Sequence, residues 1–252
     1  QGDEKCMKLW GATAKYLNEK IKDHKFFIVP LGFDEINQSV ESGDVDFALV
    51  NPSIYVELEM KYDVSRLITL KSQVSGKELI RFGGVIFTSS TNTTINTLED
   101  IKNKSFVAVD AESFGGWQTE WKEFLDHGID PYKEFAKLDF AGTQEQTVYK
   151  VLSGEYDAGA TRTGILEQLA QEGKIKLSDI KILNQCTSCN FPFLHSTQIY
   201  PEWPIARLSH VDDRLAHEVA LAMMEMKPVD EAAKNANIAG WTVPQNYTVI
   251  GN

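Results

Sequence analysis

The sequence KLDFAGTQEQTVYKVLSGEYDAGATRT, residues 137–163, has a counterpart earlier in the same chain. The counterpart is IVPLGFDEINQSVESGDVDFALVNP, residues 28–52, and the two stretches align on a shared Ser-Gly-acid-x-Asp core. Asn51 maps onto Arg162, and the offset of 111 holds throughout the aligned core. Each copy is typical of a strand, a polar turn, a short helix that ends at a glycine, and a second strand. The chain therefore contains a repeated α/β unit.

A repeat of this length predicts two similar lobes rather than a solenoid, because solenoid repeats are much shorter. Each lobe is expected to hold a mostly parallel sheet flanked by helices. We assign residues 1–84 to lobe 1 and residues 85–194 to lobe 2, and we expect residues 195–252 to return to lobe 1. The alternative is a chance similarity of two short glycine-containing turns.

The same offset makes a prediction about the start of the chain. The stretch KSFVAVDAESFGGWQTEWKEFL is typical of a strand that leads through a loop into a helix, and its Ser113 maps onto Gly2. The matching helix of lobe 1 would follow Gly2, with Leu9, Thr13 and Leu17 recurring at helical spacing. Its preceding strand would fall before residue 1, so we expect the chain to lack the first strand of lobe 1.

The stretch SFGGWQTEW, residues 113–121, places two glycines at the predicted start of a helix. A glycine inside a helix costs about 1 kcal/mol relative to alanine. Helix N-termini carry unpaired N–H groups and partial positive charge, so a bare backbone there allows an anion to approach closely. The alternative is that Ser113 caps the helix and the glycines only make the turn.

Further polar residues are expected at the carboxyl ends of strands, where open α/β sheets bind their ligands. Asn51 can cap the helix that begins at Pro52, with Tyr55 one turn later. Arg162 takes the position of Asn51 in the second copy. Its planar fork matches carboxylate, phosphate or sulfur oxyanions with two parallel hydrogen bonds. A surface or interlobe salt bridge is the alternative role for Arg162.

Another predicted helix opens at the sequence AGTQEQ. Thr143 and the N–H groups of Gln144 and Glu145 would face the same cleft as the SFGG stretch. Four helix starts on two lobes would then surround one small ligand.

Composition limits the classes of partner. The chain has 252 residues, of which 42% are hydrophobic and 24% charged, and its formal net charge is −11. With that charge and no basic run, we expect no nucleic-acid partner and no anionic membrane surface as partner. No apolar run approaches the roughly 20 residues of a membrane span, and no signal peptide is visible, so the chain is expected to be a mature or excised fragment.

The C-x-x-C pair of Cys186 and Cys189 is consistent with a redox pair, half a zinc site or a local disulfide. No second C-x-x-C and no nearby histidine pair completes a zinc site, so we expect no metal, and a local disulfide is favoured in an oxidising compartment ahead of free thiols. The enzyme motifs G-x-S-x-G, Walker loop and H-E-x-x-H are absent. We therefore expect a non-catalytic chain without a cofactor. The histidines, which lack metal-ligand spacing, are His24, His127, His195, His210 and His217.

The sequence DDRLAHEVALAMMEM near the C-terminus predicts a packed helix that returns to lobe 1. Its expected apolar stripe consists of Leu215, Val219, Leu221, Ala222 and Met226. We expect the methionines to lie in the core rather than on a binding surface.

Several motifs together resemble a known family. They are VDFALVNPSIYVELE, FGGVIFT, VDAESFGGWQ, GIDPYKEF, GTQEQTVYKVLSGEYDAGATRTGILEQLAQEGKIKL, STQIYPEWPIA and GWTVPQNY. Nearly the whole chain is similar to the periplasmic phosphate/phosphonate-binding-protein-like (PhnD-like) family, especially to members that form the extracytoplasmic sensor domain of bacterial histidine kinases. In the family the loop that matches GTQEQ more often reads Gly-Thr-His-Asp, so Gln144 replaces a histidine.

The resemblance implies an α/β type II periplasmic-binding-protein fold, with two lobes joined by a two-segment hinge. It implies that a small anion, of the phosphate, phosphonate or sulfur oxyanion type, binds in the interlobe cleft. Closure of the lobes on the anion would then be the signal. The full-length protein would be anchored to the inner membrane and carry a kinase module outside this chain, with its dimerisation left open. A free substrate-binding protein of an ABC importer for phosphonate or a similar anion is the alternative.

The resemblance also supports particular ligand-binding residues. These are Asn51, Tyr55, Ser113, Gly115, Gly116, Thr143, Gln144 and Arg162. Aromatic candidates for the pocket walls are Trp10, Phe82 and Trp203, whereas Trp117 is expected in the core because it shares a helical stripe with Trp121, Phe124 and Leu125.

Overall fold

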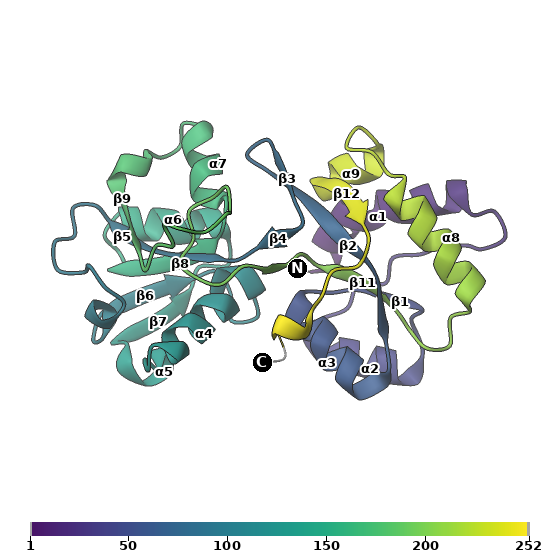
Figure 1. The fold of residues 1–252 in the computed structure, drawn as a ribbon, viewed down its shortest axis with the longest axis horizontal. Helices are drawn as coiled ribbons and strands as arrows, with labels where there is room; N and C mark the ends of the chain where they lie inside the picture. The colour runs from purple at the N-terminus through teal and green to yellow at the C-terminus, as the bar shows by residue number, and fades with distance from the viewer. Residues whose placement is uncertain (1, 251–252) are drawn as a thin grey trace. The chain divides into compact units, whose positions relative to one another are not determined.

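The computed structural model describes residues 2–250, and its contacts divide the chain into two compact units (Figure 1). Unit 1 comprises residues 1–80 and 201–252, and unit 2 comprises residues 81–200. The expected boundaries were residues 84 and 194. Two short strands, β4 (Arg81–Phe82) and β10 (Tyr200–Pro201), pair with each other where the chain passes from one unit to the other. The first boundary between the units therefore lies before Gly83 and Gly84, whereas the sequence predicted it after them.

Unit 2 is built on a five-stranded sheet with the order β7-β6-β8-β5-β9. β6 is parallel to β7 and β8, whereas β5 is antiparallel to β8 and β9. The strands are β5 (Gly84–Ser89), β6 (Ser105–Ala108), β7 (Lys137–Phe140), β8 (Ala158–Arg162) and β9 (Ile180–Leu183). Its α-helices are α4 (Thr119–Asp126), α5 (Pro131–Glu134), α6 (Gln144–Leu152) and α7 (Ile165–Gln171), with 3₁₀ turns at Glu99–Ile101 and Leu177–Asp179.

Helices cover both faces of the unit 2 sheet. Successive side chains of a strand point to opposite faces. In β6, Phe106 packs with Trp117 and Phe124 of the α4 side, whereas Val107 packs with Val148 of α6. Unit 2 is therefore a three-layer α/β/α unit with one apolar core on each face of its sheet.

Unit 1 contains a sheet with the order β1-β11-β2-β12, to which β3 adds by pairing with β2. Its described pairings are antiparallel. The strands are β1 (Phe47–Leu49), β2 (Ser65–Val74), β3 (Lys77–Leu79), β11 (Pro204–Arg207) and β12 (Ile238–Thr242). The helices are α1 (Asp3–Lys20), α2 (Phe33–Ser42), α3 (Pro52–Tyr62), α8 (Asp213–Met224) and α9 (Glu231–Ala236), with a 3₁₀ turn at Thr248–Ile250.

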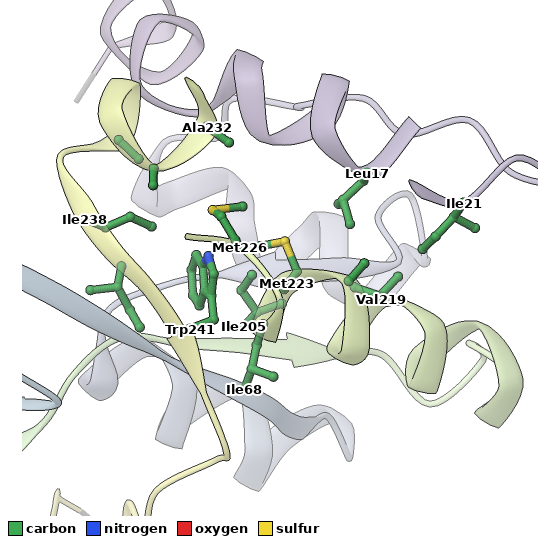
Figure 2. Packing of buried hydrophobic residues seen from close by; sticks show 14 residues of the cluster. Leu17, Ile21, Ile68, Ile205, Val219, Met223, Met226, Ala232, Ile238 and Trp241 are labelled. Carbon is green, nitrogen blue, oxygen red and sulfur yellow. The ribbon is translucent and has the colours of Figure 1, made fainter. Parts of the chain in front are cut away.

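The main core of unit 1 joins the two separate segments of the chain (Figure 2). Leu17 of α1 and Ile68 of β2 come from the first segment, and Ile205, Met223 and Trp241 come from the second. A second cluster, on the opposite face of β11, packs α2 and α3 against the sheet. Neither segment can complete the main core alone.

The C-terminal helix confirms part of the predicted stripe. Met223 and Met226 are buried in the core, as expected of the methionines, and so is Val219. Leu221 was wrongly placed in the stripe and is 47% exposed. At 100° per residue it lies about 200° from Val219 and Met223, so it faces away from the core that they contact.

The α/β fold class is confirmed, but parallel strands do not predominate as expected. Parallel neighbours need a crossover connection, and among the paired strands of residues 2–250 only β6, β7 and β8 follow one another through crossover helices. β5 follows β4 without a crossover helix, so it can run antiparallel to its neighbour β8. The strand expected at the start of the first copy, from Ile28, is not formed, and residues 25–32 lie in neither a helix nor a strand.

The two copies of the repeat have matching residues at the ends of their helices. α2 ends at Gly43 and α6 is followed by Gly154, and these glycines have φ angles of 72° and 78°, in the left-handed region that glycine favours. Gly2 and Ser113 are the N-cap residues of the two matching helices. Among the described helices, none has the length together with the apolar character that a bilayer crossing needs.

Candidate functional site

Three segments of unit 2 leave the carboxyl ends of adjacent parallel strands. The loop after β6 leads to Ser113, the loop after β7 leads to Thr143, and β8 ends at Arg162. Because β7, β6 and β8 are neighbours that run in the same direction, these three segments meet at one edge of the sheet. Open α/β sheets bind ligands at this edge.

Ser113 caps the helix that follows β6. Its Oγ accepts a hydrogen bond of 3.1 Å from the N–H of Gly116. The first turn, Phe114–Gln118, is π-helical and continues into α4. The remaining N–H groups of a first turn have no partner within the helix, and the helix dipole adds partial positive charge there. The cap that the alternative interpretation required is therefore present.

The two glycines of this turn lie where no side chain fits. A Cβ atom on Gly115 would lie 2.8 Å from Cε2 of Phe82, and a Cβ on Gly116 would lie 2.6 Å from Cγ2 of Val109. Close packing therefore requires both glycines, in addition to any role that the bare backbone has for a ligand.

Arg162 lies against an aromatic wall. Its guanidinium carbon is 4.2 Å from the centre of the Phe82 ring, which is the geometry of a cation–π contact. Phe82 is buried, and its ring is held by Phe114 at 5.5 Å between centroids. The contact places the guanidinium carbon over the Phe82 ring. Phe82 thus orients the half-buried Arg162.

Gln144 fixes the third segment beside Arg162. Thr143 caps α6 by accepting a hydrogen bond of 3.2 Å from the N–H of Gln146. The side-chain oxygen of Gln144 accepts hydrogen bonds from the backbone N–H of Arg162, at 2.9 Å, and from the hydroxyl of Thr161. Gln144 therefore joins the start of α6 to the end of β8, and its acceptor is already in use.

In unit 1, Asn51 and Tyr55 have structural partners. Asn51 caps α3 by accepting a hydrogen bond of 3.0 Å from the N–H of Ile54, as predicted. Tyr55 is fully buried and its hydroxyl donates to Glu59 and accepts from the N–H of Arg66. Burial raises the pKa of Tyr55 to about 12. The structure thus places Tyr55 in a core, where its hydroxyl bonds protein groups.

The remaining aromatic candidates also pack into cores. Trp10 lies 6.2 Å from Trp241, and Trp203 packs against the same cluster. Trp117 is fully buried, as expected. Of the predicted aromatic walls, Phe82 is the one that the structure joins to Arg162 and Gly115.

A sequence model of the family described as "ABC transporter, phosphonate, periplasmic substrate-binding protein" matches residues 1–247. The chain belongs to this family. The phosphonate-binding family consists of substrate-binding proteins, so this chain is a binding domain rather than a catalytic one. Membership also implies an extracytoplasmic location.

One curated relative is the tetrathionate sensor histidine kinase TtrS of Salmonella typhimurium, which is 31% identical over 225 residues. That match covers 88% of this chain but 38% of the relative, so the chain spans about two fifths of the relative's length.

Two solved structures of low sequence identity share the fold of this chain. PhnD1 of Prochlorococcus marinus in complex with methylphosphonate has a TM-score of 0.68 at 15% identity, and the match covers 100% of this chain and 92% of that one. XAC2383 of Xanthomonas citri bound to ATP has a TM-score of 0.70 at 14% identity, covering 96% and 87% of the two chains.

Glu120 is an unexpected residue in this member of the phosphonate-binding family. It is fully buried, its Oε2 accepts from the hydroxyl of Thr119 at 2.9 Å, and its Oε1 has no hydrogen-bond partner in the part of the chain that the structure describes. Burial raises the pKa of Glu120 well above its usual range. Gly84 makes room for the carboxyl, because a Cβ there would lie 2.0 Å from Oε1. Nothing in the sequence around a single helical glutamate indicates such burial.

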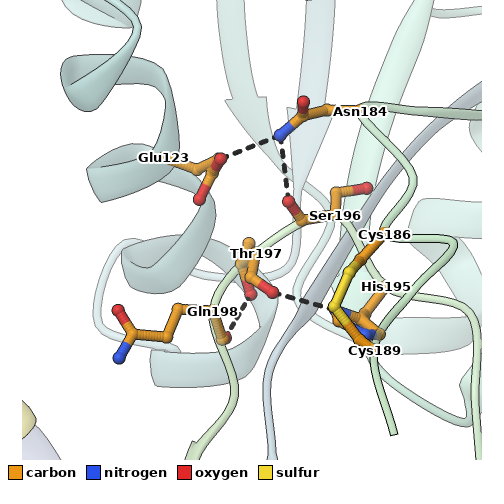
Figure 3. Close-up of a disulfide and its surroundings, with 8 residues drawn as sticks. All are labelled: Glu123, Asn184, Cys186, Cys189, His195, Ser196, Thr197 and Gln198. Carbon is orange, nitrogen blue, oxygen red and sulfur yellow. Dashed lines mark hydrogen bonds between the residues drawn. A yellow bond between two sulfur atoms is a disulfide. The ribbon is translucent and has the colours of Figure 1, made fainter. Parts of the chain in front are cut away.

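His195, which lacks metal-ligand spacing in the sequence, lies beside the cysteine pair. Cys186 and Cys189 form a disulfide, and His195 is placed next to it (Figure 3). One ligand atom from each of the three residues lies within 4.8 Å of the others. The sequence spacing gave no indication of this single histidine, because the chain turns back between Cys189 and His195.

Proposed function

We propose that the chain is the extracytoplasmic ligand-binding domain of a sensor histidine kinase and that it binds a small oxyanion through unit 2. The observation that carries this proposal is the guanidinium of Arg162, held on Phe82 at the carboxyl edge of three parallel strands beside two capped helix starts. Arg162 supplies charge and paired donors, and the helix starts supply backbone N–H groups. The similarity to the tetrathionate sensor supports the sensor role.

A sulfur oxyanion is the ligand class that these groups favour. Sulfate, thiosulfate and tetrathionate carry no proton at neutral pH, so they only accept hydrogen bonds. Inorganic phosphate keeps at least one proton throughout the neutral range, phosphonates keep one over part of that range, and a bound proton needs an acceptor. The acceptor of Gln144, at the predicted site, already bonds Arg162 and Thr161. The side-chain oxygen of Gln144 is therefore not available to accept such a proton.

A thermal-shift screen tests the proposal. The purified chain is melted with sulfate, thiosulfate, tetrathionate, phosphate or methylphosphonate, in a Cys6→Ser background because tetrathionate oxidises free thiols and Cys6 is free. A ligand that binds only the folded state raises the melting temperature by mass action, worth about 2.7 kcal/mol at a hundredfold excess over Kd. We expect one sulfur oxyanion to stabilise the chain.

Arginine variants identify the group responsible. Arg162→Ala should abolish the shift, and Arg162→Lys should weaken it because lysine keeps the charge but lacks the planar fork. Arg214→Ala is the matched control, since Arg214 is an exposed arginine of unit 1 whose ion pairs are with Asp23 and Glu218. An oxyanion shift that persists in Arg162→Ala would place the ligand elsewhere and contradict the proposal.

Signalling is proposed to follow from a ligand-induced change in the whole chain. A ligand shifts a conformational equilibrium only by its difference in affinity for the two states. Small-angle scattering with and without the stabilising oxyanion should therefore show a smaller radius of gyration in its presence. Binding with an unchanged scattering curve would argue against signalling by closure.

A free substrate-binding protein of an ABC importer is the second candidate, which the description of the family favours. The full-length gene product separates the two. A product that continues into a membrane span and a kinase, with ligand-dependent autophosphorylation in membranes, supports the anchored sensor. A product that is released from the membrane and stimulates an importer supports the second candidate.

A further inference from the structure

The loop of residues 186–195 brings three metal-ligand side chains together. The sulfur atoms of Cys186 and Cys189 and one ring nitrogen of His195 lie within 4.8 Å of one another (Figure 3). Two sulfur ligands and one nitrogen ligand at this spacing fit a thiophilic cation such as Zn²⁺.

The hydrogen bond of His195 Nδ1 leaves the other ring nitrogen, Nε2, able to bind a metal ion. His195 is 3% exposed, and its Nδ1 lies 2.9 Å from the backbone carbonyl oxygen of Thr197. A carbonyl oxygen only accepts, so Nδ1 carries the proton and Nε2 carries a lone pair. Nε2 is buried and has no hydrogen-bond partner among residues 2–250. A carbonyl that fixes the imidazole tautomer in this way is the usual outer partner of a metal-binding histidine.

The surrounding structure holds these ligands in place. The N–H of Cys186 donates to the carbonyl of His195 at 3.1 Å, which closes the loop. Ser196 bonds the carbonyl of Leu183 at 2.6 Å and the carbonyl of Gly84 at 2.9 Å, which attaches the loop to β9 and β5. Histidine and cysteines are therefore positioned by the sheet of unit 2.

An ion can reach the cluster from solvent. Both cysteines and His195 line a cavity of about 720 Å³, together with Glu123 and Asn184. Cys189 is exposed, Cys186 is half-buried and His195 is buried. Three protein ligands facing a cavity leave the fourth position of a tetrahedral zinc ion to water or another exchangeable ligand.

We propose that the reduced loop binds Zn²⁺ through the Cys186 and Cys189 thiolates and Nε2 of His195, and that the disulfide form does not. Reduction by a dithiol or a phosphine adds two electrons and two protons to the disulfide and yields two thiols. Binding of Zn²⁺ then releases both thiol protons, because thiolates are the ligands. The loop thus exists in two exclusive states, disulfide-closed or metal-closed. This site is separate from the proposed oxyanion site and does not depend on it.

Cobalt binding tests the proposal in the intact chain. A Cys6→Ser background removes the other thiol, and a phosphine is the reductant, which converts to its oxide with oxygen from water as the thiols form. Co²⁺ added to the reduced chain should give a thiolate-to-cobalt charge-transfer band and tetrahedral d–d bands that saturate at one equivalent. Zn²⁺ should displace the cobalt and bleach the bands. The oxidised chain should give none.

Variants assign the ligands. Cys186→Ser and Cys189→Ser should each remove the charge-transfer intensity of one thiolate, and His195→Ala should weaken cobalt and zinc binding by about tenfold or more. His195→Gln is the second variant in case alanine disturbs the core, and circular dichroism checks the fold of each. His24→Ala, an exposed histidine of unit 1, is the control and should bind as the parent does.

Three results would overturn the proposal. They are equal cobalt binding by the oxidised chain, binding by the reduced chain that a folded His195 variant leaves unchanged, and no thiolate-to-cobalt band in the folded reduced chain. A shift in melting temperature with Zn²⁺ only in the reduced parent would support it by an independent readout.

Discussion

At Gly115 a single added methyl group would lie 2.8 Å from the ring of Phe82 and 3.3 Å from Cγ of Arg162. Gly115→Ala should therefore displace the stacked pair, weaken oxyanion binding and lower the free energy of unfolding by about 1–3 kcal/mol. Calorimetric titration with the stabilising oxyanion and urea unfolding measure the two effects.

Gly11→Ala is the matched control for this substitution. Gly11 lies inside α1, and the nearest side-chain atom to its added Cβ is 4.0 Å away. Alanine there should stabilise the chain by up to about 1 kcal/mol without changing affinity. Unchanged affinity in Gly115→Ala would show that the position of the Phe82 and Arg162 pair does not matter for the ligand.

Glu120 makes the stability of unit 2 depend on pH. Its pKa is raised in the folded state by burial, so the folded chain holds this proton more tightly than the unfolded chain does. The contribution is fully present below the unfolded pKa, near 4.5, and is lost as pH rises toward the folded pKa. Glu120→Gln replaces the carboxyl with a neutral isostere, so its stability relative to the parent should increase with pH above about 4.5.

Urea unfolding of the parent and of Glu120→Gln from pH 4.5 to pH 8 measures this difference. The difference between the two curves is the readout, because other groups titrate equally in both proteins. Parallel curves would mean that Glu120 is not held neutral in the folded state.

At the scale of single elements, the helix start at Ser113 combines two roles that substitutions can separate. Ser113→Ala removes the cap and should cost about 1 kcal/mol of stability, with little change in affinity for the oxyanion. Ser113→Asp keeps an acceptor for the N–H of Gly116 but adds a negative charge at the proposed site. We expect near-parental stability and an affinity reduced about tenfold or more, or about 1.4 kcal/mol.

Chemical denaturation and calorimetric titration of both Ser113 variants provide the comparison. Equal affinity in Ser113→Ala and Ser113→Asp at low ionic strength would place the oxyanion away from this helix start. High salt should reduce the difference between them, because exposed charges are screened.

The elements whose form depends on neighbouring residues were predictable from the sequence. Asn51 caps its helix as predicted, Ser113 caps its helix as the alternative interpretation had it, and the helix expected at AGTQEQ begins with Thr143 as its cap. A cap needs only its own side chain and an N–H two or three residues later. Gly43 and Gly154 end their helices for an equally local reason. The repeat predicted the two α/β units, because the same pattern of strand, helix and strand occurs twice in the sequence.

Features that depend on distant residues were not predictable in this way. The direction of β5 depends on where the chain enters unit 2, and the approach of His195 to the cysteines depends on the anchoring of Ser196 to Leu183 and Gly84. Burial of Tyr55 follows from its packing against Tyr247, almost two hundred residues later. These contacts cannot be predicted from residue type and spacing.

For the whole molecule, unit 2 is a continuous segment with cores of its own. Its two clusters draw only on residues 81–200. Residues 81–200 expressed alone should therefore fold cooperatively, with dispersed amide resonances and a single unfolding transition. Residues 1–80 alone should not fold, because Ile205, Met223 and Trp241 of their core would be missing.

Nuclear magnetic resonance and urea unfolding of the two fragments test this prediction. A folded fragment 1–80, or an unfolded fragment 81–200, would show that the cores are less self-contained than their contacts indicate. The isolated unit 2 would also allow the oxyanion and metal tests to be repeated without unit 1.

The insertion of unit 2 into unit 1 also orders events during biosynthesis. During synthesis from the N-terminus, β2 is made before unit 2, but its partners β11 and β12 are made after unit 2. Unit 2 can be native while the apolar face of β2 still lacks its cover. During that interval the chain resembles a chaperone client, because exposed apolar surface and unpaired strand edges promote aggregation. Truncation or slow synthesis just after unit 2 would leave a native unit 2 attached to an aggregation-prone first segment.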